Sequence, residues 1–417
     1  MKSNYKRLGD YIQLVDKRNQ DLRDIPLMGL SISKEFIPSI ANTIGTDMST
    51  YRIIKRNHFA YGLVTSRNGE KITIALFDDY DEALISQAYI PFEVSDTNRL
   101  IPEYLIMWFR RPEFDRYARF MSHGSAREIF AWDDMCNVSL PVPTIEMQRE
   151  IVAEYSTIQN RIKLNNQLIQ KLEETAQAIY KQWFVEFEFP DEDGKPYKNN
   201  GGKMVWCEEL GKDVPEGWRV EKLKNICSKI GSGSTPTGGK ESYYSSGISL
   251  IRSTNIFDYN FSFDDLAFIN EQQADKLKNV DVIEKDILFN ITGVSVARCC
   301  IVPLCVLPAR VNQHVMIIRP LKEMDLSYYL LCTLCSTDSK NKLLGISQSG
   351  STREAITKSD IETFEIVLPN SSLLERYENL MNKVFVSKDS KSRENQKLQE
   401  FKYLLLSKLA TIDKAYG

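Results

Sequence analysis

The most regular pattern of apolar and polar positions in this 417-residue chain runs from Glu150 to Phe184. Apolar residues recur there in alternating steps of four and three, with one polar break at Asn165 and no glycine or proline. This heptad pattern predicts a helix roughly 50 Å long whose narrow apolar seam must be covered by a partner helix. The predicted seam consists of Ile151, Tyr155, Ile158, Ile162, Asn165, Ile169, Leu172, Ala176, Ile179 and Trp183.

A partner helix is expected near the end of the chain, because the two halves of the sequence are repeats. Displacing the numbering by 226 (350 minus 124) aligns Gly124–Phe184 with Gly350–Ala410 without a gap. Gly124-Ser125-x-Arg127-Glu128 then matches Gly350-Ser351-x-Arg353-Glu354. Self-similarity at a fixed interval indicates an internal duplication, so we expect two copies of one fold.

The second long helix, predicted from Leu373 to about Ala410, has a more polar seam than the first. Leu398, Leu405 and Leu409 continue its apolar stripe. We expect the two helices to meet through polar groups in the middle of their length. The positions that match Ile162, Asn165, Ile169 and Ala176 are Lys388, Lys391, Asn395 and Lys402.

Outside these helices the pattern predicts short strands and helices. In the first half, Lys71–Phe77 and Ala88–Val94 resemble strands, and Glu103–Phe120 has helical spacing. Residues 13–80 and 228–285, the opening parts of the two halves, cannot be aligned with each other. Strand-like runs in the second half are Ser249–Arg252, Val282–Asn290, Val296–Val302 and Gln313–Ile318, with Gln313 lying 226 residues after Gln87.

The predicted fold class is α+β, with two mixed α/β domains, each followed by a long helix, arranged as an internal repeat. The predicted boundaries are 1–149 for the first domain, 150–184 for the first long helix, 185–217 for a connector rich in Pro, Gly, Asp and Asn, 218–372 for the second domain, and 373–417 for the second long helix.

Composition indicates an ordinary globular protein without a global signature of its partner. With 42% hydrophobic and 26% charged residues, the chain is long enough for two or three domains. A net charge of −3 does not by itself indicate a nucleic-acid-binding protein, so any such role must rest on local patches of positive charge. No run approaches the roughly 18 apolar residues of a membrane span, and the N-terminus lacks the apolar core of a signal peptide. We therefore expect a cytoplasmic protein.

Motifs for catalysis and metal binding are missing from the sequence. There is no Pro-Pro pair to grip a flipped adenine and no GxxxxGK[ST] for ATP. His58, His123 and His314 lack metal-ligand spacing. Cys299-Cys300 and Cys332-x-x-Cys335 are expected to be buried free thiols rather than a zinc site. The acidic turn Asp78–Glu82 could hold a metal or be a solvated turn. We predict no metal and no catalytic residue.

Several stretches together resemble the specificity subunit of a type I restriction–modification system, and this resemblance extends over essentially the whole chain. They are LPVPTIEMQREIVAEY with the long helix after it, the connector QWFVEFEFPDEDGKPYKNNGGKMVWCEELGKDVPEGW, the loop GSGSTPTGGKESYY, and GSTREAITKSDIETFEIVLP before the second helix. The combination of helix and connector is specific to this family, whereas a glycine-rich loop or a coiled coil alone would not be.

The resemblance implies two target-recognition domains, each reading one half of a split, asymmetric double-stranded DNA sequence. Two long antiparallel helices would separate the two mixed α/β domains, which would be related by an internal pseudo-two-fold repeat. These helices would set the spacer and dock two DNA methyltransferase subunits and two restriction–translocase subunits. The chain would bind no cofactor itself, while S-adenosylmethionine, ATP and Mg²⁺ would be bound by those partners. The alternative hypothesis is a coiled-coil scaffold that binds proteins without reading DNA.

Candidate DNA contacts follow from residue type, because phosphates attract Lys, Arg and small polar groups while bases are read by Arg, Lys, Asn and Gln. Arg127 and Arg353 occupy the same place in the two repeats, which favours a shared role. Arg127 with Glu128 could instead be a structural pair. The candidates are Lys55, Arg56, Asn57, Arg67, Asn68 and Arg127 in the first domain, and Ser234, Thr235, Lys240, Tyr243, Arg252, Thr254, Asn255 and Arg353 in the second.

Overall fold

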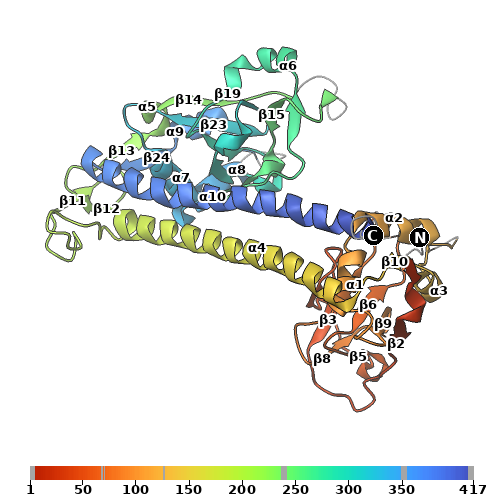
Figure 1. The fold of residues 1–417 in the computed structure, drawn as a ribbon. Coiled ribbons are helices and arrows are strands. Elements are labelled where there is room, and N and C mark those ends of the chain that lie inside the picture. Colours follow the sequence, from red (N-terminus) through yellow and green to blue (C-terminus); the bar gives the residue numbers. More distant parts are fainter. Residues whose placement is uncertain are drawn as a thin grey trace. The chain divides into compact units, whose positions relative to one another are not determined.

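The structure, a computed structural model, describes residues 5–66, 69, 71–124, 127–235, 242–348 and 355–411. The chain divides into two compact units, Met1–Leu164 with Glu394–Gly417 and Asn165–Arg393. Each unit contains a mixed domain of strands and short helices together with one end of each long helix, α4 (Ile145–Tyr180) and α10 (Ser371–Lys408) (Figure 1). We call the mixed domains domain 1 (residues 5–143) and domain 2 (residues 219–368).

Domain 1 is built on two four-stranded sheets. Neighbouring strands are antiparallel except β3 and β8, which are parallel. A small pair, β1 (Tyr5–Arg7) with β10 (Ser139–Pro141), lies beside them, and the helices are α1 (Pro102–Phe109), α2 (Pro112–Met121) and α3 (Trp132–Cys136). The strands of one sheet are, in order, β2 (Ile12–Leu14), β9 (Tyr89–Val94), β6 (Phe59–Gly62) and β7 (Ile74–Leu76). Those of the other sheet are β4 (Phe36–Pro38), β3 (Leu27–Leu30), β8 (Glu82–Ile85) and β5 (Arg52–Lys55).

Domain 2 repeats this topology strand for strand, again with a single parallel pair, β15 with β22. Its small pair is β13 (Arg219–Lys222) with β24 (Glu365–Leu368), and its matching helices are α7 (Ser327–Cys335), α8 (Thr337–Gln348) and α9 (Lys358–Thr363). The strands of its first sheet are, in order, β14 (Cys227–Ser232), β23 (Val315–Pro320), β20 (Ile287–Asn290) and β21 (Cys299–Ile301). Those of its second sheet are β18 (Ala267–Ile269), β15 (Ile248–Ile251), β22 (Ala309–Val311) and β19 (Asp281–Val282).

The duplication therefore includes the parts that the sequence could not align. Strand β9 falls on β23 at the predicted displacement of 226 (89 + 226 = 315), and the opening segments 13–80 and 228–285 also share one order of strands. Domain 2 also has a hairpin of β16 (Ile256–Phe257) with β17 (Asn260–Phe261) and the short helix α6 (Glu271–Lys276), which have no counterpart among the described residues of domain 1. Its helix α5 (Leu223–Ile226) occupies the place of the 3-10 turn Leu8–Asp10 of domain 1.

Two predicted elements proved to be interrupted. The predicted helix Glu103–Phe120 is divided into α1 and α2, because Pro112 has no amide proton to continue α1 and holds Arg111 in an extended conformation. The predicted strand Val282–Asn290 is divided into β19 and β20 by a turn in which Lys285 has φ of 65°. The backbone amide of Ile283 donates to Asp286 Oδ2 at 2.8 Å and stabilises that turn.

The long helices begin earlier than predicted. Helix α4 starts at Ile145 rather than Glu150, where the Thr144 hydroxyl accepts a hydrogen bond from the Met147 amide at 3.4 Å. Helix α10 starts at Ser371, where the Asn370 side chain accepts from the Leu373 amide at 2.9 Å. Thr144 and Asn370 are separated by 226, so both helices start at a capping residue at the same place in each repeat.

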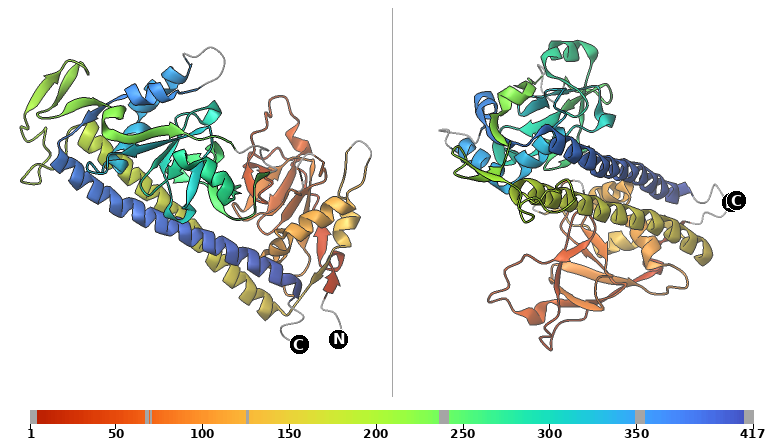
Figure 2. Two further views of the ribbon diagram at one scale, coloured as in Figure 1. Left: turned by 90° about the horizontal axis from the view of Figure 1, so that it is seen from above. Right: turned by 90° about the vertical axis from the view of Figure 1, so that its left-hand side faces the viewer.

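The predicted seam positions face away from solvent. Those from Ile151 to Trp183 are buried or half-buried, as are Leu398, Leu405 and Leu409. Within the second unit, the rings of Trp183 and Tyr377 lie 5.7 Å apart, and the buried Lys388 pairs with Glu173. Within the first unit, Arg161 Nε lies 2.5 Å from Glu394 Oε1, and Lys402 lies over the Tyr155 ring. The helices thus pair antiparallel in each unit (Figure 2), with polar contacts between them as expected.

The predicted connector 185–217 is more ordered than its composition suggested. Helix α4 continues into a π-helical turn, Lys181–Val185, after which β11 (Met204–Cys207) and β12 (Lys212–Pro215) form a hairpin. Phe187 and Phe189 pack against Trp218, with ring centroids 5.3 and 5.7 Å from it. These aromatic contacts join the connector to the core of the second unit. Among the described residues, no helix combines the length and apolar character needed to cross a bilayer.

Buried polar side chains of the long helices hold the first helix of each domain. Gln148 of α4 is completely buried and accepts from the Ile101 amide at 2.8 Å, just before α1. Glu378 of α10, 4% exposed, accepts from the Tyr329 and Tyr328 amides at 2.7 and 3.2 Å, at the start of α7. Burial raises the pKa of Glu378 from 4.5 to about 8, although the two amides oppose that shift.

The raised pKa of Glu378 predicts a pH-dependent stability of the second unit. Between pH 4.5 and about 8 the native protein binds more protons at this site than the unfolded chain, so the site's contribution is complete at low pH and is lost as pH rises. The slope should reach at most about 1.4 kcal/mol per pH unit. Urea unfolding from pH 5.5 to 8.5 should show Glu378→Gln with a flatter profile than wild type. The control, Glu375→Gln on an exposed position of α10, should keep the wild-type slope, and equal slopes in all three proteins would contradict the prediction.

Candidate nucleic-acid interface

Domain 1 carries an excess of positive charge along its outermost strand, β5. The backbone of residues 17–19 runs beside this strand, with the Ile53 amide donating to Lys17 O at 2.7 Å and the Asn19 amide to Tyr51 O at 2.9 Å. This pairing brings cations from two separate segments together. We call them the domain 1 basic cluster: Lys17, Arg18, Arg23, Arg52 and Lys55.

Five basic side chains in this cluster share two carboxylates. Asp16 lies 3.3 Å from Arg18 Nε and 3.6 Å from Arg52 Nε. Glu82 pairs with Arg23 and lies 4.0 and 3.7 Å from the Nζ atoms of Lys17 and Lys55. The hydrogen bond from Arg23, with the nearby cations, lowers the pKa of Glu82, so the carboxylate is ionised. Three positive charges (five minus two) remain in excess and are suited to contact phosphates.

Arg56 and Asn57, predicted to contact DNA, form the turn after β5. Arg56 is exposed, but its guanidinium donates to Asp78 O at 2.7 Å and pairs with Asp81 at 3.3 Å, so it belongs to the acidic turn. Asn57 has φ of 70° and donates its amide to Phe77 O, which makes it a turn residue. Of the three neighbouring candidates, Lys55 alone joins the basic cluster.

The Gly-Ser-x-Arg segment of domain 1 presents Arg127 on the surface. Arg127 is exposed, and the second hypothesis for it, a pair with Glu128, is wrong, because Glu128 Oε2 lies 2.6 Å from Arg119. Gly124 has φ of 142°, and a Cβ atom there would lie 2.1 Å from Arg127 O. The glycine is therefore needed to bring the chain round before Arg127. Arg67, Asn68, Lys240 and Arg353 lie outside the described residues.

In domain 2 the candidates gather where the parallel strands β15 and β22 end. The Asn312 amide donates to Ile251 O at 3.1 Å, which places Arg252 beside the turn after β22. The Gly233 amide donates to Asn312 O at 3.1 Å, which brings the glycine-rich loop to the same edge. We call this surface the domain 2 polar edge: Ser234, Thr235, Arg252, Thr254, Thr292, Gln313 and His314.

Hydrogen bonds link the side chains of the polar edge. Thr235 donates to Gln313, whose Nε2 lies 3.2 Å from His314 Nε2, and His314 Nδ1 lies 2.7 Å from Thr292 Oγ1. A bridge from Thr292 to Ala355 brings the residues after the second Gly-Ser-x-Arg copy to this edge. Glutamine and threonine side chains, together with the nearby Arg252, are among the groups that read base edges.

The domain 2 candidates Arg252, Thr254 and Asn255 differ in accessibility. Arg252 stands 5.7 Å from the Tyr243 ring centroid and donates to Asp265 O, while Thr254 is exposed. Asn255 is completely buried, and its amide donates to Ser262 O and Asp264 O at 3.0 and 3.1 Å. Asn255 is therefore a structural residue and a correction to the predicted set.

The region of domain 2 that matches the basic cluster is more nearly balanced in charge. Arg310 lies 2.5 Å from Asp281, and Arg319 forms two bonds of 2.6 and 2.7 Å with the buried Asp286. Lys229 donates to Asn279 O and is the third cation there. At this place in the fold the two domains thus differ, with an excess of cations in domain 1 and mostly paired charges in domain 2.

A group of possible metal ligands lies elsewhere in domain 2, and it already has a cation. Among the residues that the structure describes, Asp258, Cys299 and Cys335 bring one ligand atom each within 4.8 Å of one another. Lys340 Nζ lies 2.6 Å from Asp258 Oδ1 and also donates to Ala297 O. Burial raises the pKa of the Cys335 thiol well above its usual value, which favours the neutral form. The ammonium of Lys340 neutralises the carboxylate, so we assign this group to the domain core.

Sequence reasoning missed Lys17, Arg18 and Arg23 as well as Gln313 and His314. Lys17, Arg18 and Arg23 lie in the segment DKRNQDLRD, where acidic neighbours balance their charge along the sequence. These cations join Arg52 and Lys55 only because the backbone of this segment pairs with β5. Gln313 carried a usable signal, because it opens a predicted strand and matches Gln87 at the displacement of the repeat. Both glutamines are exposed at the turn that leads into the central strand of their sheet.

Comparison with known proteins agrees with this architecture. The family model described as type I restriction modification DNA specificity domain matches twice, at residues 19–174 and 215–373. The chain is 27% identical over 312 residues to the type I restriction enzyme MjaIX specificity subunit of Methanocaldococcus jannaschii, covering 74% of this chain and 68% of the relative. It is 22% identical over 409 residues to the HindI specificity subunit of Haemophilus influenzae, covering 86% of each.

A solved structure shares the fold. The type I restriction–modification S subunit from M. genitalium matches with a TM-score of 0.58 and 12% identity, over 97% of this chain and 95% of the other. The two family matches together span more than half of the chain, the first covering most of domain 1 and of α4 and the second covering domain 2. The chain therefore belongs to the family of type I restriction–modification DNA specificity subunits.

Proposed function

We propose that each domain of this DNA specificity subunit reads one half of a bipartite, asymmetric DNA target. The observation that carries the proposal is the repetition of one strand topology with different surface chemistry. Domain 1 has the basic cluster beside β5, where the matching region of domain 2 is nearly balanced in charge, and domain 2 has the polar edge at the ends of β15 and β22. Duplicated domains of one fold can dock on DNA in the same way, while different side chains on their surfaces select different bases.

The long helices are proposed to set the spacer between the half-sites. Each helix is a single element with one end in each unit, and its seam is buried there against the other helix. Helices supported in this way are stiff enough to keep a constant distance between two DNA contacts, whatever bases lie in the gap.

The partners proposed are double-stranded DNA, two methyltransferase subunits and two restriction–translocase subunits. Methyl transfer and cleavage, with S-adenosylmethionine, ATP and Mg²⁺, would then belong to those partners, and the present chain would supply target choice. Because its net charge is −3, it should bind DNA weakly alone and more tightly in the complex, where the partners add phosphate contacts.

Domain exchange tests the proposal. The complex with its methyltransferase subunits should methylate a random duplex library at one bipartite motif, read by methylation-sensitive sequencing. Replacing residues 1–149 by those of a relative with another target should change one half-site and leave the other half-site and the spacer unchanged. A complex without sequence preference would instead support the protein-interaction scaffold, as would an exchange that leaves the motif intact.

The basic cluster predicts a second result. Lys17 and Lys55 are half exposed and lie 4.0 and 3.7 Å from Glu82, so both can turn to phosphates. The double variant Lys17→Ala/Lys55→Ala should weaken binding of the complex on target and random duplexes alike. The slope of log affinity against log salt should fall in magnitude by about 1 to 2, which corresponds to the loss of one or two phosphate contacts.

The control for this measurement is Arg56→Ala, because Arg56 is also exposed and basic but is bound by the acidic turn. Fluorescence anisotropy across a salt series should give Arg56→Ala the wild-type slope. An equal loss in the control and the double variant would show that general charge, rather than the basic cluster, governs binding.

A further inference from the structure

A buried lysine lies at the contact between domain 2 and the long helices. Lys388 of α10 is 6% exposed, although it occupies a seam position where the first repeat has Ile162 (162 + 226 = 388). A buried ammonium costs several kcal/mol of desolvation unless it is fully paired. Its partners therefore show what this residue holds together.

The ammonium of Lys388 binds groups from two other elements. Its Nζ lies 2.8 Å from Glu173 Oε1 on α4, and it donates to the main-chain oxygen of Tyr259 in the turn between β16 and β17. The Phe385 ring of α10 lies 5.8 Å away and covers the ion pair. One side chain thus ties both long helices to a hairpin of domain 2, and we call this contact the Lys388 joint.

The hairpin is a rigid part of domain 2. The Tyr259 amide donates to Cys299 O at 3.0 Å, while Asp258 Oδ1 accepts from the Cys299 amide at 3.1 Å and from Lys340 at 2.6 Å. Movement of the turn would therefore carry β21 and α8 with it. The hairpin also follows directly after Arg252–Asn255, so the joint lies a few residues from the polar edge.

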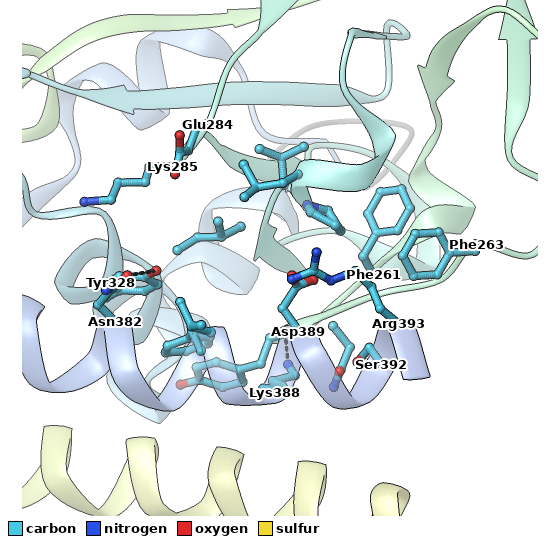
Figure 3. A pocket seen from close by; sticks show the side chains of 18 residues that line it. Phe261, Phe263, Glu284, Lys285, Tyr328, Asn382, Lys388, Asp389, Ser392 and Arg393 are labelled. Carbon is cyan, nitrogen blue, oxygen red and sulfur yellow. Dashed lines mark hydrogen bonds and ion pairs between the residues drawn. The ribbon is translucent and has the colours of Figure 1, made fainter. Parts of the chain in front are cut away.

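A cavity of about 200 Å³ lies beside the joint, between part of domain 2 and α10 (Figure 3). Phe261 and Phe263 line its domain side, and Asp389 and Arg393 line its helix side. The cavity interrupts the packing of Phe261 and Phe263 on α10. Apolar contact with α10 is made beside it by Tyr259 of the hairpin and across it by Tyr328, which stack on Phe385 at 6.5 and 4.9 Å, and Tyr328 also donates to Asn382 at 3.0 Å.

We infer that Lys388 is a positioning residue that fixes the orientation of domain 2 on the helix pair and thereby restricts the spacer length the subunit accepts. The inference rests on the proposed function. An ion pair with a directed bond to a main-chain oxygen defines one geometry, whereas apolar side chains of the same size would allow neighbouring ones. The seam of the first repeat has isoleucine at this position, so this restraint belongs to domain 2.

The variants remove the joint while keeping its volume. Lys388→Met alone leaves Glu173 without its ammonium, so Lys388→Met combined with Glu173→Gln is the main variant, and it should fold because apolar replacement of a whole buried pair is often neutral. Lys388→Arg keeps the charge and should retain most of the restraint. The matched control is Lys397→Met, which removes a lysine from an exposed position of the same helix.

The experiment uses the complete complex with its methyltransferase subunits and a duplex library that carries the wild-type half-sites at spacers from two base pairs shorter to two longer. Methylation at spacers changed by one base pair, relative to the native spacer, should rise about tenfold in the double variant, the discrimination expected from one charge-assisted hydrogen bond. The half-sites should stay the same, and Lys388→Arg and Lys397→Met should keep the wild-type spacer.

The outcomes distinguish failure of the inference about Lys388 from failure of the proposed function. If wild type methylates without a preferred spacer, the proposal that the long helices set the spacer is wrong. If wild type keeps one spacer and the folded double variant keeps it as strictly, the positioning role of Lys388 is refuted. A uniform loss of methylation at all spacers, with the same distribution, would also refute it, because a merely structural role lowers activity without altering the choice of spacer.

Discussion

The structure depends on the burial of two narrow apolar stripes. Helices α4 and α10 are 36 and 38 residues long, and neither could keep its stripe from water alone. In each unit they cover one another, and residues of the mixed domain complete the burial, as Tyr155 with Leu406 and Leu409 in the first unit and Ala176 with Tyr377 in the second show. Burial of this kind needs two long helices, and the internal repeat supplies both of them from one chain.

The same constraint explains what the sequence could predict. Heptad spacing, the displacement of 226 and the strand-like runs Ala88–Val94 and Gln313–Ile318 are strong signals, and they located the helices, the repeat and the central strands β9 and β23. The opening segments gave no such signal. Their strands are two to six residues long, and the shared topology is maintained by burial at positions where many apolar residues fit. In these opening segments the fold was preserved while the sequence similarity between the two repeats was lost.

The candidate interface was harder to predict, because it is assembled from distant segments. Lys17 and Arg52 are neighbours only through the pairing of residues 17–19 with β5, and Thr235 meets Gln313 only through the sheet. Residue type alone also misjudged Asn255, a polar residue that satisfies buried main-chain oxygens. An asparagine next to a turn predicts a hydrogen bond but not whether its partner is a base or the protein's own backbone.

Buried polar groups occur where the long helices meet the domains, and they differ between the two repeats. Domain 1 is held by the amide of Gln148, which carries no charge, whereas domain 2 is held by Glu378 and by Lys388 with Glu173. Apolar packing provides most of the stability of such contacts, but it tolerates small displacements. Hydrogen bonds to main-chain atoms do not, so these side chains determine orientation more than stability. After duplication, the two copies could thus diverge in how firmly they hold their domains as well as in the surfaces that they present.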